Sequence, residues 1–394
     1  MRSNSYRNIS QFEDSESIKK PRICMFTTRN FTRKGFQCGL YEKQDVLSKI
    51  DDVDLICLNT EKGYQLRENI LRRLVWHDFT NRFVLLNPGL QPIYLSREYE
   101  LFIAICGTWK DLLHINAIKD WGKKCEKSVC WIDEVWAADL PLSKSWLPAL
   151  KKFDHVVVGL KGSVDVLSNA IGKQCHFVPG AVDAIRFSPY PHPPPRVIDV
   201  YSMGRRWEGI HQALRKLATR EKIFYVYDTI EGSVAQTLDH RQHRDAIANF
   251  AMRSQYFMVA PAKMDQPEEV QGQIEIGNRY FEGSAAGAVM IGQMPDCESF
   301  NTLFDWPDVV IEIKPDGSDV LDVLSALSLQ PERLREISRR NAIEALLRHD
   351  WVYRWRHILG ISGLKPRPAM EERERHLKLL AENASNNRLE MKIY

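Results

Sequence analysis

The sequence predicts an α/β protein made of two doubly wound, Rossmann-like domains that face each other across a cleft. Three observations lead to this prediction. The chain has 394 residues, more than one ordinary hydrophobic core accommodates. Short apolar, β-rich runs alternate with longer amphipathic runs along most of it. A cluster of prolines interrupts the alternation once, near the middle, and the alternation then restarts.

The first array of strands is predicted from runs that are apolar on both faces. These runs cover residues 23–28, 53–58, 100–106, 128–135, 155–160 and 175–180. Helices are predicted between them over residues 39–50, 108–121, 143–153 and 163–172. Runs without a polar face are typical of a parallel sheet covered by helices on both sides. We therefore assign residues 21–188 to a first Rossmann-like domain that follows a polar, flexible tail over residues 1–20.

Five prolines then mark a linker, because proline continues neither a helix nor a central strand. They are Pro189, Pro191, Pro193, Pro194 and Pro195, and the linker spans 189–196. Further strands are predicted at 197–204, 222–228, 255–261, 288–292 and 309–313, with helices at 211–218, 243–254, 278–287, 320–327 and 331–359. Residues 197–360 are therefore predicted to form a second Rossmann-like domain, and 361–394 a charged helical tail that includes a helix over 371–383.

The composition excludes several classes of protein. A formal net charge of +3, with 54 basic and 51 acidic residues, does not predict a nucleic-acid-binding protein. The eight cysteines form no CxxC pair, and several lie in apolar runs, so we expect buried free thiols in a reducing compartment. No signal peptide and no apolar run long enough for a membrane span are visible. We expect a cytoplasmic protein, and the composition leaves room for peripheral contact with a membrane.

Ligands of open parallel sheets bind beyond the carboxyl ends of the strands, so the residues that follow each strand are candidates. Gly204, Arg205 and Arg206 follow the first strand of the second domain. A glycine at this point permits a tight turn, and two arginines can bind phosphate oxygens through charge-assisted bonds. Alternatively, this is a solvated basic loop.

The segment 272–287 is the strongest functional candidate. Gly277 and Asn278 mark a helix start, with Asn278 the expected N-cap, and the free amides of a first helical turn bind anions. Arg279 adds a positive charge there. Glu282 lies three residues beyond Arg279, on the same helical face, where a carboxylate can accept bonds from ribose hydroxyls. The alternative is an ordinary exposed glutamate on a surface helix.

Asp133 and Glu134 follow a buried strand of the first domain, where a carboxylate can act as general base toward an acceptor hydroxyl. They can equally be the solvated end of a strand. Asp52 and Asp54 form a D-x-D pair, but they precede a strand, so we predict no metal site there. No histidine has the spacing of a catalytic triad or of a metal site.

These motifs together resemble the GT-B nucleotide-sugar glycosyltransferases. The connector of that family is matched by six positions: Pro179, Gly180, Val182, Asp183, Phe187 and Pro189. The run 201–206 is similar to the glycine-arginine turn that opens the family's donor domain, and 278–292 to its donor-site helix and following strand. The pattern over residues 22–360 is most similar to the group of family-4-like and CgeB-type transferases.

The resemblance implies a GT-B fold in which residues 21–188 form the acceptor-side domain and residues 197–360 the donor domain. It also implies a nucleotide-diphosphate-sugar as donor substrate, and no metal or other cofactor. It also implies that Glu282 binds the nucleotide ribose and that Arg205 or Arg206 binds the pyrophosphate. Two departures matter. The family's second glutamate would fall at Ile274, with Glu275 one place away, and the lysine that usually follows the turn is missing, so Lys263 or Arg279 is expected to replace it.

The sequence therefore predicts a hexosyltransferase-type enzyme that moves a sugar from a nucleotide-diphosphate donor to a glycan, lipid or small-molecule hydroxyl, with retention and without metal. If the reaction inverts configuration, Asp133 or Glu134 is the expected base. Two alternatives stay open. One is a non-catalytic relic of the fold that binds or serves as a scaffold, and the other is a nucleotide-sugar epimerase or a phosphorylase.

Overall fold

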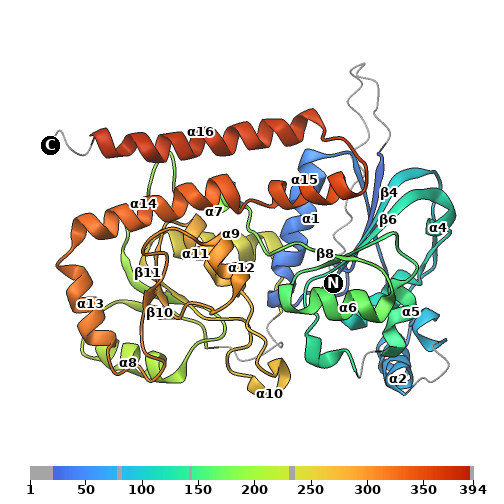
Figure 1. Cartoon of the computed structure of the whole chain (residues 1–394), viewed down its shortest axis with the longest axis horizontal. Coiled ribbons are helices and arrows are strands. Elements are labelled where there is room, and N and C mark those ends of the chain that lie inside the picture. Colours follow the sequence, from blue (N-terminus) through green and yellow to red (C-terminus); the bar gives the residue numbers. More distant parts are fainter. Residues whose placement is uncertain (1–20, 78–81, 142–143, 230–235, 391–394) are drawn as a thin grey trace, which may run out of the picture.

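The computed structural model describes residues 21–77, 82–141, 144–229 and 236–390. It contains two parallel sheets, one from each half of the chain, with helices on both faces of each (Figure 1). The predicted tail over residues 1–20 lies outside the described residues. Apolar runs form the central strands because both faces of a parallel sheet are covered.

The first sheet has six parallel strands in the order β2-β1-β4-β6-β7-β8. Their bounds are β1 (Ile23–Thr27), β2 (Val53–Cys57), β4 (Tyr99–Cys106), β6 (Cys125–Ile132), β7 (His155–Val158) and β8 (Cys175–Phe177). The helices of this half are α1 (Cys38–Ile50), α2 (Tyr64–Trp76), α3 (Leu112–Ile115), α4 (Trp121–Lys124), α5 (Leu147–Leu150), α6 (Val164–Ile171) and α7 (Ala184–Phe187). All six predicted strands are present.

The second sheet has five parallel strands in the order β10-β9-β11-β12-β13. They are β9 (Ile198–Ser202), β10 (Tyr225–Tyr227), β11 (Ser254–Val259), β12 (Val289–Gly292) and β13 (Ile311–Glu312). The helices are α8 (Glu208–Thr219), α9 (His240–Met252), α10 (Pro267–Val270), α11 (Asn278–Ala285), α12 (Glu298–Leu303), α13 (Val320–Ser328), α14 (Pro331–Arg348), α15 (Trp351–Ile361) and α16 (Pro368–Glu390). All five predicted strands of this half are present as well.

Two predicted helices are wrong in extent. The predicted helix over 108–121 is broken, because Ile118 is buried in a short strand, β5 (Ile118–Lys119), which pairs with β3 (Ile93–Tyr94). The predicted helix over 331–359 ends after Arg348 and a new one starts at Trp351. Asp350 separates them, and its side chain caps α15 by accepting a hydrogen bond from the backbone N–H of Val352.

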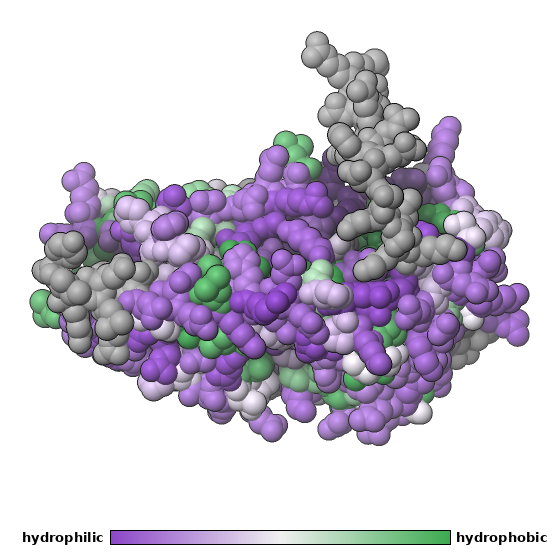
Figure 2. Space-filling model, turned by 90° about the horizontal axis from the view of Figure 1, so that it is seen from above, coloured by the Kyte–Doolittle hydropathy of each residue, from purple (hydrophilic) through white to green (hydrophobic). Residues whose placement is uncertain are grey.

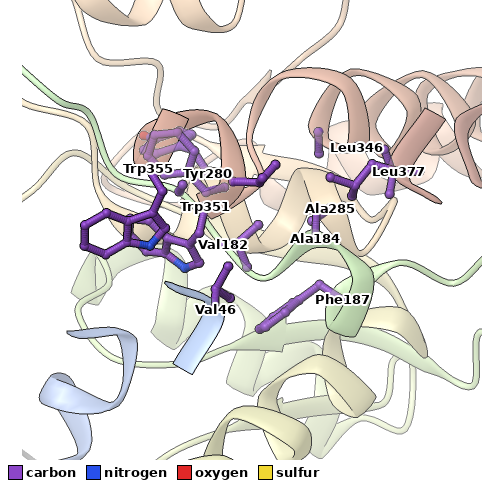
Figure 3. Packing of buried hydrophobic residues seen from close by; sticks show 14 of the residues in the cluster. Val46, Val182, Ala184, Phe187, Tyr280, Ala285, Leu346, Trp351, Trp355 and Leu377 are labelled. Carbon is purple, nitrogen blue, oxygen red and sulfur yellow. The ribbon is translucent and has the colours of Figure 1, made fainter. Parts of the chain in front are cut away.

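One continuous hydrophobic cluster joins the two halves (Figure 3). Val46 of α1 and Trp131 of β6 belong to the first half, and Tyr280 of α11 belongs to the second. Trp351 and Trp355 of α15 pack edge-on against Trp131, with ring centroids 6.0 and 5.4 Å away. Although α15 follows the second sheet in sequence, its aromatic face therefore completes the core of the first.

The long helix α16 runs along the top of the molecule, over α14 and towards α15 and α1 (Figure 1). Arg373 on this helix binds Asp183, in the connector, and Asp350, at the start of α15, at 2.7 and 2.6 Å. The face seen from above is mainly hydrophilic, with hydrophobic residues scattered over it (Figure 2). All eight cysteines are free, and five of them are buried, as the sequence predicts.

Candidate functional site

The loops that follow the strands of the two sheets meet between the two halves. Lys263, after β11, forms an ion pair with Glu134, after β6, at 2.9 Å. Nearby, the Glu275 carboxylate accepts hydrogen bonds from the backbone N–H groups of Gly162 and Lys161, at 2.7 and 3.1 Å. The carboxyl ends of both sheets therefore face one another, which is where ligands of parallel sheets bind.

The turn after β9 has the geometry predicted for it. Gly204 adopts a left-handed φ of +80°, which favours glycine, and its N–H donates to Asp228 at 3.0 Å. Arg206 also binds Asp228, at 2.6 Å, and Arg205 binds Asp265 at 2.9 Å. Both arginines thus already have a carboxylate partner, and Arg205 is the more exposed of the two.

The helix α11 begins beside this turn. Its N-cap residue is Gly277, whereas the sequence predicted Asn278. A Cβ at this position would lie 2.7 Å from the carbonyl oxygen of Ala260, the residue that follows β11, so the space favours a glycine. No side chain caps the helix. The N–H of Tyr280 donates back to the carbonyl of Gly277, at 3.3 Å, so the N–H groups of Asn278 and Arg279 are the ones left for another acceptor.

Arg279 connects the helix to the turn. Its Nε donates to the carbonyl of Met203 at 3.1 Å, and its Nη1 binds Glu282. The guanidinium remains partly exposed, whereas the Glu282 side chain is only 4% exposed. The alternative of an exposed surface glutamate is therefore wrong.

Glu282 has a second partner that the sequence analysis missed. Arg244 of α9 binds Glu282 through Nη1 and Glu42 of α1 through Nε, the latter at 2.7 Å. The two arginines lower the pKa of Glu282 against the opposing effect of burial, which is the larger single contribution. Since each carboxylate oxygen of Glu282 already accepts from a guanidinium, a ribose would have to share or displace those bonds.

His243, also on α9, was missed as well. It is half-buried, and burial together with the charges of Arg244 and Arg279 lowers its pKa. A neutral imidazole therefore lies beside the arginine cluster. Nothing in the sequence signals this arrangement, because Glu42 and Arg244 are 202 positions apart and α9 has no motif of its own.

On the opposite side, Asp133 follows β6 and is partly exposed, with a side-chain exposure of 32%. It binds the ammonium group of Lys43, which is buried in α1. The same ammonium lies 3.9 Å from the ring centroid of Trp131 and 4.9 Å from that of Trp351. Burial raises the pKa of Asp133 and lowers that of Lys43, because it disfavours both charged forms.

The structure thus gathers the predicted residues into two groups. Gly204, Arg206, Gly277, Asn278, Arg279 and Glu282 lie together at the second sheet, while Asp133, Glu134 and Lys263 lie where the two halves meet. Arg205 instead binds Asp265, in the loop after β11 that also holds Lys263. Within the described ranges, no three histidine, cysteine, aspartate or glutamate side chains are placed to hold a metal ion. Asp54 of the D-x-D pair instead binds Tyr99, at 2.7 Å, and Arg97.

The comparisons with known proteins agree with this architecture. Residues 205–360 match the family model described as "Glycosyl transferase-like". An α-glucosyltransferase in complex with UDP and a 13-mer DNA superposes on 87% of this chain and 100% of its own, with 12% identity and a TM-score of 0.53.

Two further structures are also similar. A UDP-N-acetylglucosamine 2-epimerase has 12% identity, 88% and 97% coverage and a TM-score of 0.49. A glycosyltransferase from Rickettsia africae has 11% identity, 87% and 98% coverage and a TM-score of 0.48. No curated protein sequence matches the chain.

The chain has the GT-B fold, and its residues 205–360 match a family model of glycosyltransferase-like proteins. The glycosyltransferase-like sequence lies in the second half of the chain. The CgeB-type subgroup stays a prediction.

Proposed function

We propose that the enzyme transfers a sugar from a nucleotide-diphosphate donor to a hydroxyl acceptor, with retention of configuration and without a metal ion. The observation that carries this proposal is the placement of Arg279. It is a partly exposed guanidinium on the first turn of an uncapped helix, held against the Gly204 turn. A helix start and a fixed arginine together suit a diphosphate. The complex of the α-glucosyltransferase with UDP supports a nucleotide of this kind.

In the proposed reaction, the acceptor oxygen bonds to the anomeric carbon of the sugar while the bond from that carbon to the diphosphate oxygen breaks. Arg279 and the first-turn amides of α11 stabilise the charge that develops on the departing diphosphate. With retention, the acceptor proton passes to the diphosphate oxygen. With inversion, Asp133 accepts it, because its raised pKa makes it a better base than an ordinary carboxylate.

For Glu282 we propose a positioning role and a smaller role in binding the donor. It holds Arg279 and Arg244 in place, and it contributes to ribose binding only through lone pairs that the guanidinium groups leave available. Arg205 is the second candidate for the diphosphate, since its partner Asp265 is exposed and can release it. Lys263, tied to Glu134, is proposed to bind the donor from the interdomain side.

The acceptor is proposed to approach Asp133 from the first half of the chain, and a glycan, lipid or small molecule each fits a hydroxyl nucleophile. The balanced net charge argues against nucleic acid as partner. We propose a cytoplasmic location, because eight free cysteines are typical of a reducing compartment.

A thermal-shift screen of nucleoside diphosphates and diphospho-sugars tests the donor site. A ligand at about 100 times its Kd adds about 2.7 kcal/mol to the stability of the folded state. We expect one nucleotide to raise the Tm of the wild type and to have a much smaller effect on Arg279→Gln. Arg335→Gln is the matched control, because Arg335 forms an exposed pair with Glu332 at the same spacing. If no nucleotide stabilises the wild type, the donor site is misassigned.

Asp133→Asn separates binding from chemistry. We expect the variant to bind the nucleotide as the wild type does. If the enzyme inverts, donor turnover falls by about 100-fold or more, as for the loss of a general base. If the enzyme retains, turnover falls much less. A binding-competent wild type that neither transfers nor hydrolyses any donor would favour the scaffold alternative.

A further inference from the structure

The helix α2 carries apolar side chains on two faces. Leu71 and Val75 face the core of the first half and are buried. Leu66, Ile70 and Leu74, spaced four residues apart, form a stripe on the outer side, with 66%, 49% and 43% of each side chain exposed. A regular apolar stripe facing solvent differs from the scattered surface leucines of ordinary proteins.

Neighbouring elements carry further exposed apolar residues. The 3-10 helix that follows α2 (Phe83–Leu85) packs against α2 and against α5, which in turn packs on α6. Leu85 and Leu86 are exposed at this point. A groove of about 470 Å³ opens along α5 and α6, lined by Leu140, Leu147 and Val166. In Figure 1, α2, α5 and α6 lie together on the first half of the chain.

Basic residues surround the apolar surface. Lys62, Arg67, Arg73 and Arg82 are exposed on and beside α2, and Lys144 and Lys151 line the groove itself. Of the acidic residues of α2 and the segment before it, Glu68 is buried and Glu61 is paired with Arg67. The surface therefore combines apolar side chains with an excess of positive charge.

We propose that this surface of α2, the following 3-10 helix and α5, which we call the α2 surface, docks the enzyme on an anionic lipid bilayer. An apolar stripe with a basic border is the combination that binds at the interface of such a bilayer, with leucines among the acyl chains and arginines at the phosphates. None of the helices in the described ranges is long and apolar enough to cross a membrane, so the contact is interfacial. The proposal does not depend on the proposed function.

Co-sedimentation of the full chain with vesicles tests the proposal. We expect binding to vesicles that contain phosphatidylglycerol, weak binding to phosphatidylcholine alone, and weaker binding at high salt. The variant R73E/R82E should bind about thirtyfold or more weakly, because each basic residue near an anionic surface contributes about fivefold. The variant L66Q/I70Q/L74Q should lose more than about tenfold through the apolar contact.

The matched control is L321Q/L329Q/L379Q, which removes three exposed leucines elsewhere on the molecule, and it should bind vesicles as the wild type does. All variants change exposed side chains, so their Tm should match that of the wild type. Equal binding of L66Q/I70Q/L74Q and wild type would overturn the proposal, as would no preference for the anionic lipid. A wild type that ignores vesicles but forms a dimer that L66Q/I70Q/L74Q abolishes would overturn it in favour of a second copy of the chain.

Discussion

Arg244 holds one guanidinium between two carboxylates, Glu42 and Glu282, at a place where all three side chains are at most 5% exposed. Glu42 also accepts hydrogen bonds from the indole of Trp351 and from the backbone N–H of Asp183. Buried charges are tolerated only when they are paired and hydrogen-bonded. This network therefore fixes α1, α9 and α11 relative to one another, directly behind the proposed diphosphate site.

Removing one residue of this network should lower the free energy of unfolding. We expect Glu282→Ala to lower the free energy of unfolding by about 3 kcal/mol, because it leaves a buried guanidinium with half of its partners. The exposed control Glu332→Ala should change it by less than about 0.5 kcal/mol. Urea unfolding of both variants checks this, and a loss of less than 1 kcal/mol for Glu282→Ala would show that the network contributes little.

His349 gives the stability a dependence on pH. It is fully buried among aromatic rings, and burial together with the charges of Arg354 and Arg348 lowers its pKa well below the usual value. The folded state thus keeps the imidazole neutral while the unfolded state takes up a proton below about pH 6.5. The stability from this residue is present above that pH and is lost as the pH falls, by up to about 1.4 kcal/mol per unit.

The variant His349→Gln checks this contribution, since glutamine still offers Arg354 an acceptor but does not titrate. Urea unfolding between about pH 7 and 5 should show a smaller loss of stability in the variant than in the wild type. Parallel curves for the two proteins would contradict the assignment.

At the scale of elements, the strands were predictable and α2 was not. Eleven apolar runs in the sequence predicted the eleven strands of the two main sheets, because burial on both faces leaves a local signal. The helix α2 is apolar on its inner and outer sides, so it lacks the single apolar stripe by which a surface helix is recognised. In the candidate site, too, local features were predictable and long-range ones were not. The Arg279–Glu282 spacing is visible in the sequence, whereas the pairing of Lys43 with Asp133 spans 90 positions.

Gly277 sets the position of α11 against β11. We expect Gly277→Ala to cost about 1–3 kcal/mol, since the new methyl group would overlap a backbone oxygen, and to weaken nucleotide binding because the first turn of α11 must move. Gly360→Ala in α15 is the matched control, because nothing lies within 4 Å of its added methyl. Unfolding and nucleotide titration check both variants. Unchanged nucleotide affinity in Gly277→Ala would separate the helix start from the donor site.

On the scale of the whole molecule, one hydrophobic cluster spans both sheets, each sheet has a second cluster of its own, and α15 and α16 lie across both halves (Figure 1). A shared core and a bridging helix imply that neither half unfolds alone. Arg373 is central to this connection, because it neutralises Asp350 and Asp183, both of which are buried.

We therefore expect calorimetry of the wild type to show one transition. Arg373→Met should lower the free energy of unfolding by about 3–5 kcal/mol, because it leaves the buried Asp350 without its cation and Asp183 with only Arg186, at 4.0 Å. Arg375→Met, an exposed neighbour on α16, should change it little. Two resolved transitions in the wild type would contradict the shared core.

Because α15 packs on the first sheet but follows the second sheet in sequence, the first sheet is translated before the helix that covers it. The indole rings of Trp351 and Trp355, which cover Trp131, are made more than 200 residues after the strand on which they pack. Until they leave the ribosome, the apolar side of α1 and the end of β6 stay without their cover. The first half of the nascent chain therefore exposes apolar surface until the second half has been translated. During that interval this surface is available to chaperones that bind exposed apolar side chains.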